Sequence, residues 1–471
     1  MSFAVLEDVY SHYINPTTFR EYDIRGLIGT TLFAQDAYYI GKAFAWYIVN
    51  NSPIRKICIG YDGRMSTPML LKELVDGITS VGVDVFDIGM CPTPMLYYST
   101  NTSNIEHGIM ITGSHNQPDY NGFKFVFGKK PFYGEQIKEL LTIMKNGFQG
   151  KIMATGKRIY DSNTFDNYVT TLYNSATFGT TDFKVAWDVS NGSGAKVVQA
   201  LSSIMPGTHY ILNGKIDGTF PGHDPDPTVH KNLKQLIDFV IKENCSVGIA
   251  LDGDADRVVV VDKKGRIFSG DQLLAIFAKF MVKKNPSMSV ILDIKSSKVI
   301  FDYIANLGCV PLLWKTGHSN IKAKMPELKA KLAGEVSGHI FFADKYFGYD
   351  DGIYGAIRVL EIISQGGDIS SDFDELPKSF ITPEVRIECA DDRKFDVIEE
   401  IRERLVTKKA NFLDIDGLRV DTNDGWWLLR VSNTQPALVI RFESFNENGL
   451  ERLHAELKEQ LLLSNVQVNI S

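Results

Sequence analysis

The chain has 471 residues, 44% hydrophobic and 23% charged, which is typical of a globular protein with about three domains. Its 50 Lys and Arg against 57 Asp and Glu give a net charge of −7, which argues against nucleic acid or an anionic membrane as the main partner. The five cysteines lack CxxC spacing and no apolar run approaches the ~18 residues of a membrane span. We therefore expect a reduced, cytoplasmic protein without a zinc site or a disulfide framework.

The first charged motif is FREYDIRG, residues 19–26, in which Arg20 and Arg25 flank an acidic turn. Its composition alone fits a solvated turn. Alternatively, Arg25 reaches a phosphate with its planar fork of donors, aided by the flexible Gly26.

A unit of strand, loop, helix and strand then occurs three times. The first strand of each unit is apolar and ends at an aspartate, namely Asp62, Asp188 or Asp293. The second strands end near residues 89, 214 and 317. Three such units predict three related α/β domains with largely parallel sheets, whose strand-to-helix loops face ligands.

Within the first domain, residues 109–127 (IMITGSHNQPDYNGFKFVF) place Ser114 in a polar loop, predicted at 112–122, between two apolar strands. Three interpretations compete. Ser114 is a plain loop serine, or a hydrolase nucleophile, for which the GxSxG pattern is missing. The third is a serine that carries a phosphoryl group, which requires a cation and basic groups nearby because phosphoserine carries about −1.5 to −2 charges.

Residues 249–261 (IALDGDADRVVVV) place Asp252, Asp254 and Asp256 in a tight loop between two apolar strands. Carboxylates this close repel one another unless a cation neutralises them, and oxygen ligands favour Mg²⁺ or Mn²⁺. A phosphate oxygen on Ser114 could complete the coordination, and Arg257 could contact the phosphoryl group. A solvated acidic turn is the alternative.

Further polar groups lie at strand ends of the third repeat and in the loop GEVSGHIFF, residues 334–342. A carboxylate beside a serine can read the hydroxyls of a sugar ring, which Glu335 and Ser337 could do. His339, Lys295 and His318 could each donate to a ligand or handle a proton, although each alone is also compatible with a structural role.

The last part, from about residue 377, predicts a compact α+β domain with a mixed or antiparallel sheet and a closing helix at about 447–462. Within it, RVSNTQPA places Arg430, Ser432, Asn433 and Thr434 in one turn that could bind phosphate oxygens. An ordinary hairpin turn explains the Asn and Pro equally well.

The motifs FREYDIRG, TGSHNQPDYNGFK, DGDADR, GEVSGH and RVSNTQPALVIRFE, in this order, resemble the α-D-phosphohexomutase superfamily, and within it the bacterial phosphomannomutase/phosphoglucomutase group. The resemblance implies a four-domain enzyme that interconverts hexose 1-phosphates and 6-phosphates of mannose, glucose or both. Phosphorylated Ser114 would donate its phosphoryl group, a hexose 1,6-bisphosphate would form, and one Mg²⁺ per chain would be held by Ser114 and the three aspartates.

The same resemblance implies roles for individual residues. The expected catalytic groups are Ser114, Arg25, Lys124, Arg257 and His318. The expected substrate-binding groups are Tyr22, Lys295, Glu335, Ser337, His339, Arg430, Ser432, Asn433 and Thr434. The departures from the group's pattern are small, Gln117 where Pro is frequent and Val336 where Met is frequent, and neither removes a chemical group from the mechanism.

We expect a phosphoserine domain at residues 1–158, a metal-binding domain at 159–264, a sugar-binding domain at 265–376 and a phosphate-binding domain at 377–471, arranged around a central cleft in a monomer. The alternatives are a phosphoglucosamine mutase, a DxD-type phosphatase with Asp252 as nucleophile, and a non-catalytic sugar-phosphate binding protein.

Overall fold

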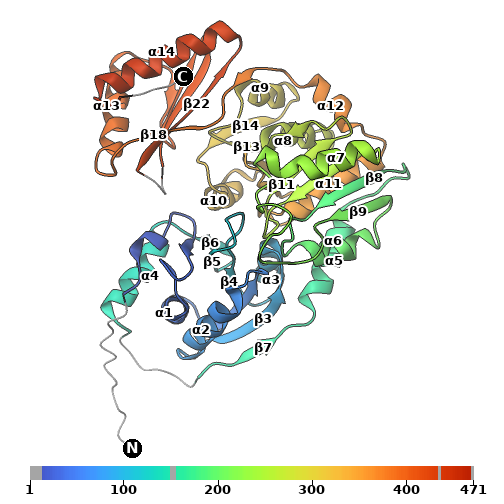
Figure 1. Cartoon of the computed structure of the whole chain (residues 1–471), viewed down its shortest axis with the longest axis vertical. Helices are drawn as coiled ribbons and strands as arrows, with labels where there is room; N and C mark the ends of the chain where they lie inside the picture. The colour runs from blue at the N-terminus through green and yellow to red at the C-terminus, as the bar shows by residue number, and fades with distance from the viewer. Residues whose placement is uncertain (1–12, 149–154, 433–435, 468–471) are drawn as a thin grey trace, which may run out of the picture. The chain divides into compact units, whose positions relative to one another are not determined.

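A computed structural model describes residues 13–148, 155–432 and 436–467 (Figure 1). The chain divides into two compact units. The first comprises Met1–Gly270 and Ser337–Ser370, and the second comprises Asp271–Val336 and Ser371–Ser471. Within the described ranges, no helix has the length and apolarity needed to cross a membrane.

The first unit opens with a seven-stranded sheet of order β1-β5-β4-β2-β3-β7, in which β6 also pairs with β5. Its strands are β1 (Ile24–Leu27), β2 (Lys56–Tyr61), β3 (Asp84–Met90), β4 (Gly108–Ile111), β5 (Tyr120–Phe127), β6 (Lys130–Phe132) and β7 (Arg158–Tyr160). The neighbouring helices are α1 (Ala34–Asn51), α2 (Thr67–Thr79), α3 (Thr93–Thr102) and α4 (Glu135–Asn146). Strands β4, β2, β3 and β7 run parallel, whereas β1 and β5 are antiparallel to their neighbours.

Local sequence explains where two of these helices begin. Both α2 and α3 carry proline in the first turn, where the missing N–H has no helical partner to lose. The sheet is covered by an aromatic core in which the ring of Phe44 on α1 lies 5.0 Å from that of Phe125 and 5.2 Å from that of Phe132. The loop between β4 and β5 therefore starts and ends in strands whose residues belong to this buried core.

A second sheet of the first unit has the order β12-β11-β10-β8-β9. It consists of β8 (Lys184–Asp188), β9 (Thr208–Leu212), β10 (Val247–Leu251), β11 (Val258–Asp262) and β12 (Ile267–Phe268). Other elements of the same unit are α5 (Thr164–Ser175), α6 (Ala195–Ser202), α7 (Lys234–Lys242), β16 (Ile340–Phe342) and α11 (Gly352–Ser364). Every residue of β10 and β11 is buried, so the acidic loop between them is anchored at both ends.

The second unit contains the parallel strands β13 (Ser289–Asp293), β14 (Val310–Trp314) and β15 (Leu332–Gly334), with helices α9 (Lys298–Asn306) and α10 (His318–Leu328). Helices α8 (Gly270–Met281) and α12 (Ile369–Glu375) lie where the chain passes between units. The C-terminal part is an antiparallel sheet of β17 (Phe380–Ile381), β18 (Val385–Glu388), β19 (Phe412–Leu413), β20 (Leu418–Thr422), β21 (Gly425–Val431) and β22 (Ala437–Ser444), with α13 (Lys394–Thr407) and α14 (Glu447–Leu463).

The structure confirms the predicted fold class of three related α/β parts followed by an α+β part. The three repeats are β2-α2-β3, β8-α6-β9 and β13-α9-β14, and the two strands of each pair in parallel. One predicted boundary is wrong. The serine loop is shorter than expected because β5 already begins at Tyr120.

Candidate active site

Ser114 lies in the loop between β4 and β5, only 2% exposed. Its hydroxyl donates to Asp252 Oδ2 over 3.2 Å and lies 3.2 Å from Nδ1 of His115. Its backbone has a φ of +49°, in the left-handed region that residues other than glycine seldom adopt. Such a conformation persists only where the surroundings enforce it, and it occurs most often at functional sites.

Asp252, Asp254 and Asp256 lie in the loop between β10 and β11 and are completely buried. One carboxylate oxygen from each lies within 4.8 Å of the others, close enough to share a cation. Ala255 within this loop also has a positive φ, +57°. Gly253 allows the two loops to approach closely, because a Cβ there would stand 2.5 Å from the carbonyl oxygen of Ser114.

Three cationic side chains of the first unit surround these groups. Lys124 on β5 is buried, and its Nζ lies 2.7 Å from Asp254 Oδ2 and 2.5 Å from Asp256 Oδ2. Arg25 on β1 donates from Nη1 to the carbonyl of Gly113 over 3.2 Å and pairs with Asp23. The backbone N–H of Arg257 donates to Asp252 Oδ1 over 3.2 Å.

The crowding of charge shifts the protonation of these groups. Burial, reinforced by Asp256 and Asp254, raises the pKa of Asp252 well above its ordinary value. Burial alone would also raise the pKa of Asp256, but the ammonium of Lys124 overrides it and holds that pKa well below the usual range. Burial and the nearby Arg257 and Arg25 lower the pKa of His115 well below its ordinary value, so its ring is neutral near pH 7.

His339 extends the site within the same unit. Its Nε2 accepts from Arg257 Nε over 3.2 Å and lies 3.3 Å from Asp256 Oδ1, while its Nδ1 lies 3.2 Å from the hydroxyl of Ser337. Asp256, His339 and the buried Asp350 form a second group whose ligand atoms all lie within 4.8 Å. The sequence did not single out Asp350, although it follows the GEVSGH loop closely.

The second unit carries the other predicted residues. Lys295 Nζ lies 3.1 Å from Glu384 Oε1, and Arg430 Nη2 lies 2.8 Å from Asp416 Oδ2. The 2%-exposed carboxylate of Glu335 accepts from the N–H of Gly317 over 2.6 Å. His318 begins α10, and the carbonyl of Ser432 accepts from Lys394 Nζ over 2.8 Å.

Two predicted residues, Asn433 and Thr434, lie outside the described residues. Tyr22 is half-buried in a bend before β1. The sequence reasoning missed Thr93, whose hydroxyl donates to Asp254 Oδ2 over 2.5 Å, and Arg64, which contacts the serine loop. The signal for Arg64 was its place two residues after the aspartate that ends the first repeat strand.

A buried serine hydroxyl bonded to one of three clustered carboxylates, with a lysine and arginines around it, suits the transfer of a phosphoryl group. Domain models of the phosphoglucomutase/phosphomannomutase family match the chain in four consecutive segments. The α/β/α domains I, II and III match residues 16–151, 166–265 and 269–380, and the C-terminal domain matches residues 384–460.

Among curated proteins, the chain is 41% identical to a phosphomannomutase/phosphoglucomutase of Pseudomonas aeruginosa over 94% of this chain and 95% of that protein. It is 39% identical to a phosphoglucomutase of Neisseria gonorrhoeae over 93% and 95% of the two chains. Among solved structures, a phosphoglucomutase/phosphomannomutase family protein from Burkholderia thailandensis superposes with a TM-score of 0.90 at 35% identity, covering 97% of this chain and 99% of the other.

The fold and these relatives define a phosphohexomutase, an enzyme of the isomerase class. The chain belongs to the phosphoglucomutase/phosphomannomutase family.

Proposed function

We propose that this enzyme interconverts the 1-phosphates and 6-phosphates of glucose and mannose, with Ser114 as the phosphoryl carrier and a hexose 1,6-bisphosphate as the intermediate. The observation that carries the proposal is the 3.2 Å contact between the Ser114 hydroxyl and Asp252, inside a buried cluster that holds both carboxylates and cations. A glucose–mannose pair fits because relatives named for both sugars match most of the chain.

The carboxylate cluster fits a divalent cation. Three fully buried carboxylates face one Lys124 ammonium, so negative charge exceeds the positive charge in direct contact with it. Among the described residues, no hydrogen-bond partner exists for the buried Oδ1 of Asp254. Oxygen-only donors at this spacing favour Mg²⁺, and when bound it would neutralise the phosphoryl oxygens on Ser114 and make the phosphorus electrophilic.

The side chains around Ser114 then have separate roles in phosphoryl transfer. Arg25 donates to the serine loop at Gly113, and Arg257 directly follows the three aspartates; both can bind the phosphoryl oxygens, because a guanidinium presents paired donors to them. His339, which contacts Arg257 and Asp256, can exchange a proton with the attacking or departing sugar hydroxyl, as can Lys124. The Ser114 loop excludes water from the carrier, since the hydroxyl is almost inaccessible.

Recognition of the sugar phosphate is assigned to the second unit together with Tyr22, Ser337 and His339. Glu335 and Ser337 would bind the ring hydroxyls O3 and O4, which glucose and mannose share. Lys295, His318, Arg430, Ser432, Asn433 and Thr434 would bind the remaining ring atoms and the phosphate that does not react. In the structure Lys295 and Arg430 pair with Glu384 and Asp416, and a phosphate would compete with these carboxylates for the two cations.

The proposed division into residues 1–158, 159–264, 265–376 and 377–471 is supported by the four matched segments, which fall inside these limits to within a few residues. The runner-up activity is that of a phosphoglucosamine mutase, which differs in the sugar but not in the carrier. A phosphatase that uses Asp252 as nucleophile would leave Ser114 without a chemical role.

The test combines mass spectrometry with assays on three substrates. We expect phosphate on the Ser114 peptide of the purified enzyme, stable to mild base as an acyl phosphate is not. We also expect turnover of glucose 1-phosphate and mannose 1-phosphate well above that of glucosamine 1-phosphate, and a Ser114→Ala variant that is folded but reduced in activity by orders of magnitude. Full activity of Ser114→Ala would refute the carrier.

A further inference from the structure

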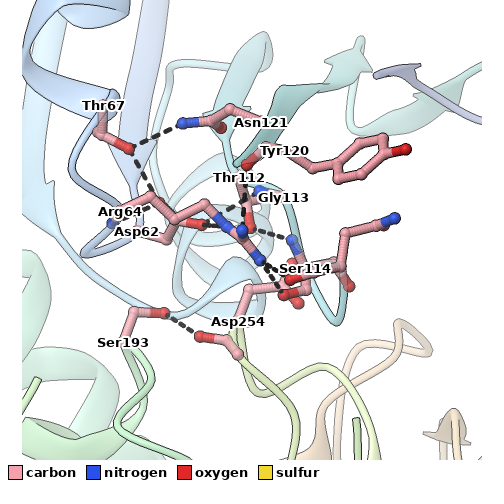
Figure 2. Close-up of polar contacts among 12 residues, drawn as sticks. Asp62, Arg64, Thr67, Thr112, Gly113, Ser114, Tyr120, Asn121, Ser193 and Asp254 are labelled. Carbon is pink, nitrogen blue, oxygen red and sulfur yellow. Dashed lines mark hydrogen bonds and ion pairs between the residues drawn. The ribbon is translucent and has the colours of Figure 1, made fainter. Parts of the chain in front are cut away.

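The backbone of the loop that carries Ser114 is hydrogen-bonded to one arginine, Arg64, which follows a different strand (Figure 2). Arg64 follows β2 and is 2% exposed. Its Nη2 donates to the carbonyls of Ser114 over 2.8 Å and Asn116 over 2.6 Å. Its Nη1 donates to the carbonyls of Gln117 over 2.5 Å and Tyr120 over 3.0 Å.

The remaining donor of the guanidinium, Nε, lies 3.1 Å from Asp62 Oδ2. All five N–H donors therefore have an acceptor, and four of the acceptors are backbone carbonyls of the short segment from Ser114 to the first residue of β5. A planar fork of five fixed donors can span this set, whereas a lysine offers three donors from a single point. The site therefore requires the donor geometry of an arginine, and a positive charge alone does not replace it.

Asp62 joins the arginine to the backbone before the serine. The same Oδ2 accepts from the N–H of Gly113 over 3.1 Å, and Oδ1 accepts from the N–H of Arg64 and from the hydroxyl of Thr67, the latter over 2.9 Å. Gly113 itself packs flat on the guanidinium, because a Cβ there would stand 2.4 Å from Cζ of Arg64. The contacts on both sides of Ser114 enforce its φ of +49°.

We propose that Arg64 is a positioning residue for the phosphoryl carrier, fixing the backbone of residues 113–120 so that the Ser114 hydroxyl faces Asp252. The proposal rests on the proposed function of Ser114 and extends it to a residue that contacts the backbone of the serine loop and not the serine hydroxyl. In-line phosphoryl transfer depends on the placement of the reacting oxygen, and a misplacement of about 1 Å can reduce a rate about 10²-fold.

This role predicts an effect on turnover and not on substrate affinity. The described contacts of the Arg64 guanidinium are with Asp62, loop carbonyls and the ring of Phe220, and none is with a residue assigned to the sugar or the distal phosphate. Loss of the Arg64 guanidinium therefore leaves the sugar-binding groups in place but allows the backbone of the serine loop to shift.

The main test is Arg64→Lys, which retains the charge. We expect kcat to fall by about 10²-fold while KM changes by less than about threefold. Loading of Ser114 by glucose 1,6-bisphosphate, followed by intact mass, should slow in parallel. The matched control is Arg158→Lys, because Arg158 also pairs with an aspartate of this sheet, Asp87 in β3, and none of its described contacts is with the serine loop. The control should retain wild-type kcat.

A folded Arg64→Lys enzyme with kcat within about twofold of the wild type, or one altered mainly in KM, overturns the proposal. If that variant does not fold, Thr67→Val decides, because it keeps the side-chain volume and removes only the hydroxyl bonded to Asp62 and to Asn121 Nδ2. A smaller fall in kcat at constant KM supports the role, and wild-type kcat overturns it. Failure of the proposed function is seen separately, as a wild-type enzyme without phosphate on Ser114 or a fully active Ser114→Ala.

Discussion

Lys124 offers a test of the carboxylate cluster that does not depend on turnover. Its buried ammonium is the cation that directly bridges Asp254 and Asp256, at 2.7 and 2.5 Å. Burial lowers its pKa, but attraction to these carboxylates outweighs burial and raises the pKa above its ordinary value, so the group is charged at any working pH. A Lys124→Met variant keeps an unbranched side chain that is one atom shorter and leaves the carboxylates without this partner.

Removing one partner of a buried ion pair costs about 3–5 kcal/mol. The first unit spans about 300 residues, and an unfolding entropy of about 2.1 cal/mol/K per residue converts this cost into a drop of about 5–8 °C in Tm. The drop should appear in EDTA by differential scanning calorimetry. Mg²⁺ should raise the Tm of the variant more than that of the wild type, because a bound cation replaces the missing charge. A bound ligand stabilises by about 2.7 kcal/mol at 100 times its Kd.

The matched control is Lys42→Met, which removes another buried lysine of the first unit, one that packs over the ring of Phe148 and lies outside the cluster. Its Tm should not respond to Mg²⁺ more than that of the wild type does. An unchanged Tm of Lys124→Met in EDTA, or the absence of any Mg²⁺ response in both wild type and variant, would refute the description of the carboxylates as a cation site.

Three further perturbations follow from the structure. Burial raises the pKa of Asp351 from 3.8 to about 7, so its contribution to stability is complete below about pH 4 and is lost as the pH rises through 7. The Asp351→Asn variant should flatten this pH dependence of the free energy of unfolding, by up to about 1.4 kcal/mol per pH unit in urea titrations. An unchanged slope would exclude Asp351 as the source of the dependence. Arg430→Ala should weaken the affinity for substrate by about 1.5–3 kcal/mol, measured as Kd by calorimetry, and an unaltered Kd would remove Arg430 from the phosphate site. Four donors surround the buried carboxylate of Glu443, so Glu443→Gln, which replaces one acceptor with a donor, should lower the free energy of unfolding by about 1.5–3 kcal/mol; urea midpoints equal to wild type would contradict this.

The elements that the sequence predicts well are those with a strong local pattern. The repeat strands before Asp62, Asp188 and Asp293 are apolar runs closed by a polar residue, and each was placed to within a residue or two. The length of the loop that holds Ser114 was overestimated because Asn121 and Gly122, which are residue types typical of loops, already pair with Gly26 and Arg25 in the sheet. Pairing with a distant strand overrode local propensity there.

The site was predictable where chemistry follows residue type. A serine that carries a phosphoryl group needs a cation nearby, and three clustered aspartates can hold one, so the sequence predicts that the two loops meet. The structure places Ser114 beside Asp252. The partners of the cations were not predictable, because Arg64 binds backbone carbonyls, which every residue has. The same holds for Thr93, whose hydroxyl reaches Asp254 from a helix start 161 positions earlier in the chain. No spacing rule in the sequence marks such contacts.

The repeats nevertheless contain a rule that connects these findings. In each repeat the first strand lies beside the strand that precedes a candidate functional loop, since β2 pairs with β4, β8 with β10 and β13 with β15. The loops at their carboxyl ends therefore meet. The residue two positions after each aspartate is Arg64, Ser190 or Lys295.

Arg64 binds the carbonyl of Ser114, and the hydroxyl of Ser190 donates over 2.7 Å to the carbonyl of Leu251, directly before the loop that holds the three aspartates. In the third repeat the aspartate takes over this support, because Asp293 Oδ1 accepts from the N–H of Val336 over 3.4 Å, and Lys295 reaches Glu384 instead. The residue two positions after the aspartate thus supports a neighbouring loop in the first two repeats, and in the third it pairs with Glu384. In all three repeats a residue at or just after the end of the first strand is hydrogen-bonded to the backbone at the neighbouring loop. The polar residues that these loops carry differ from one repeat to the next.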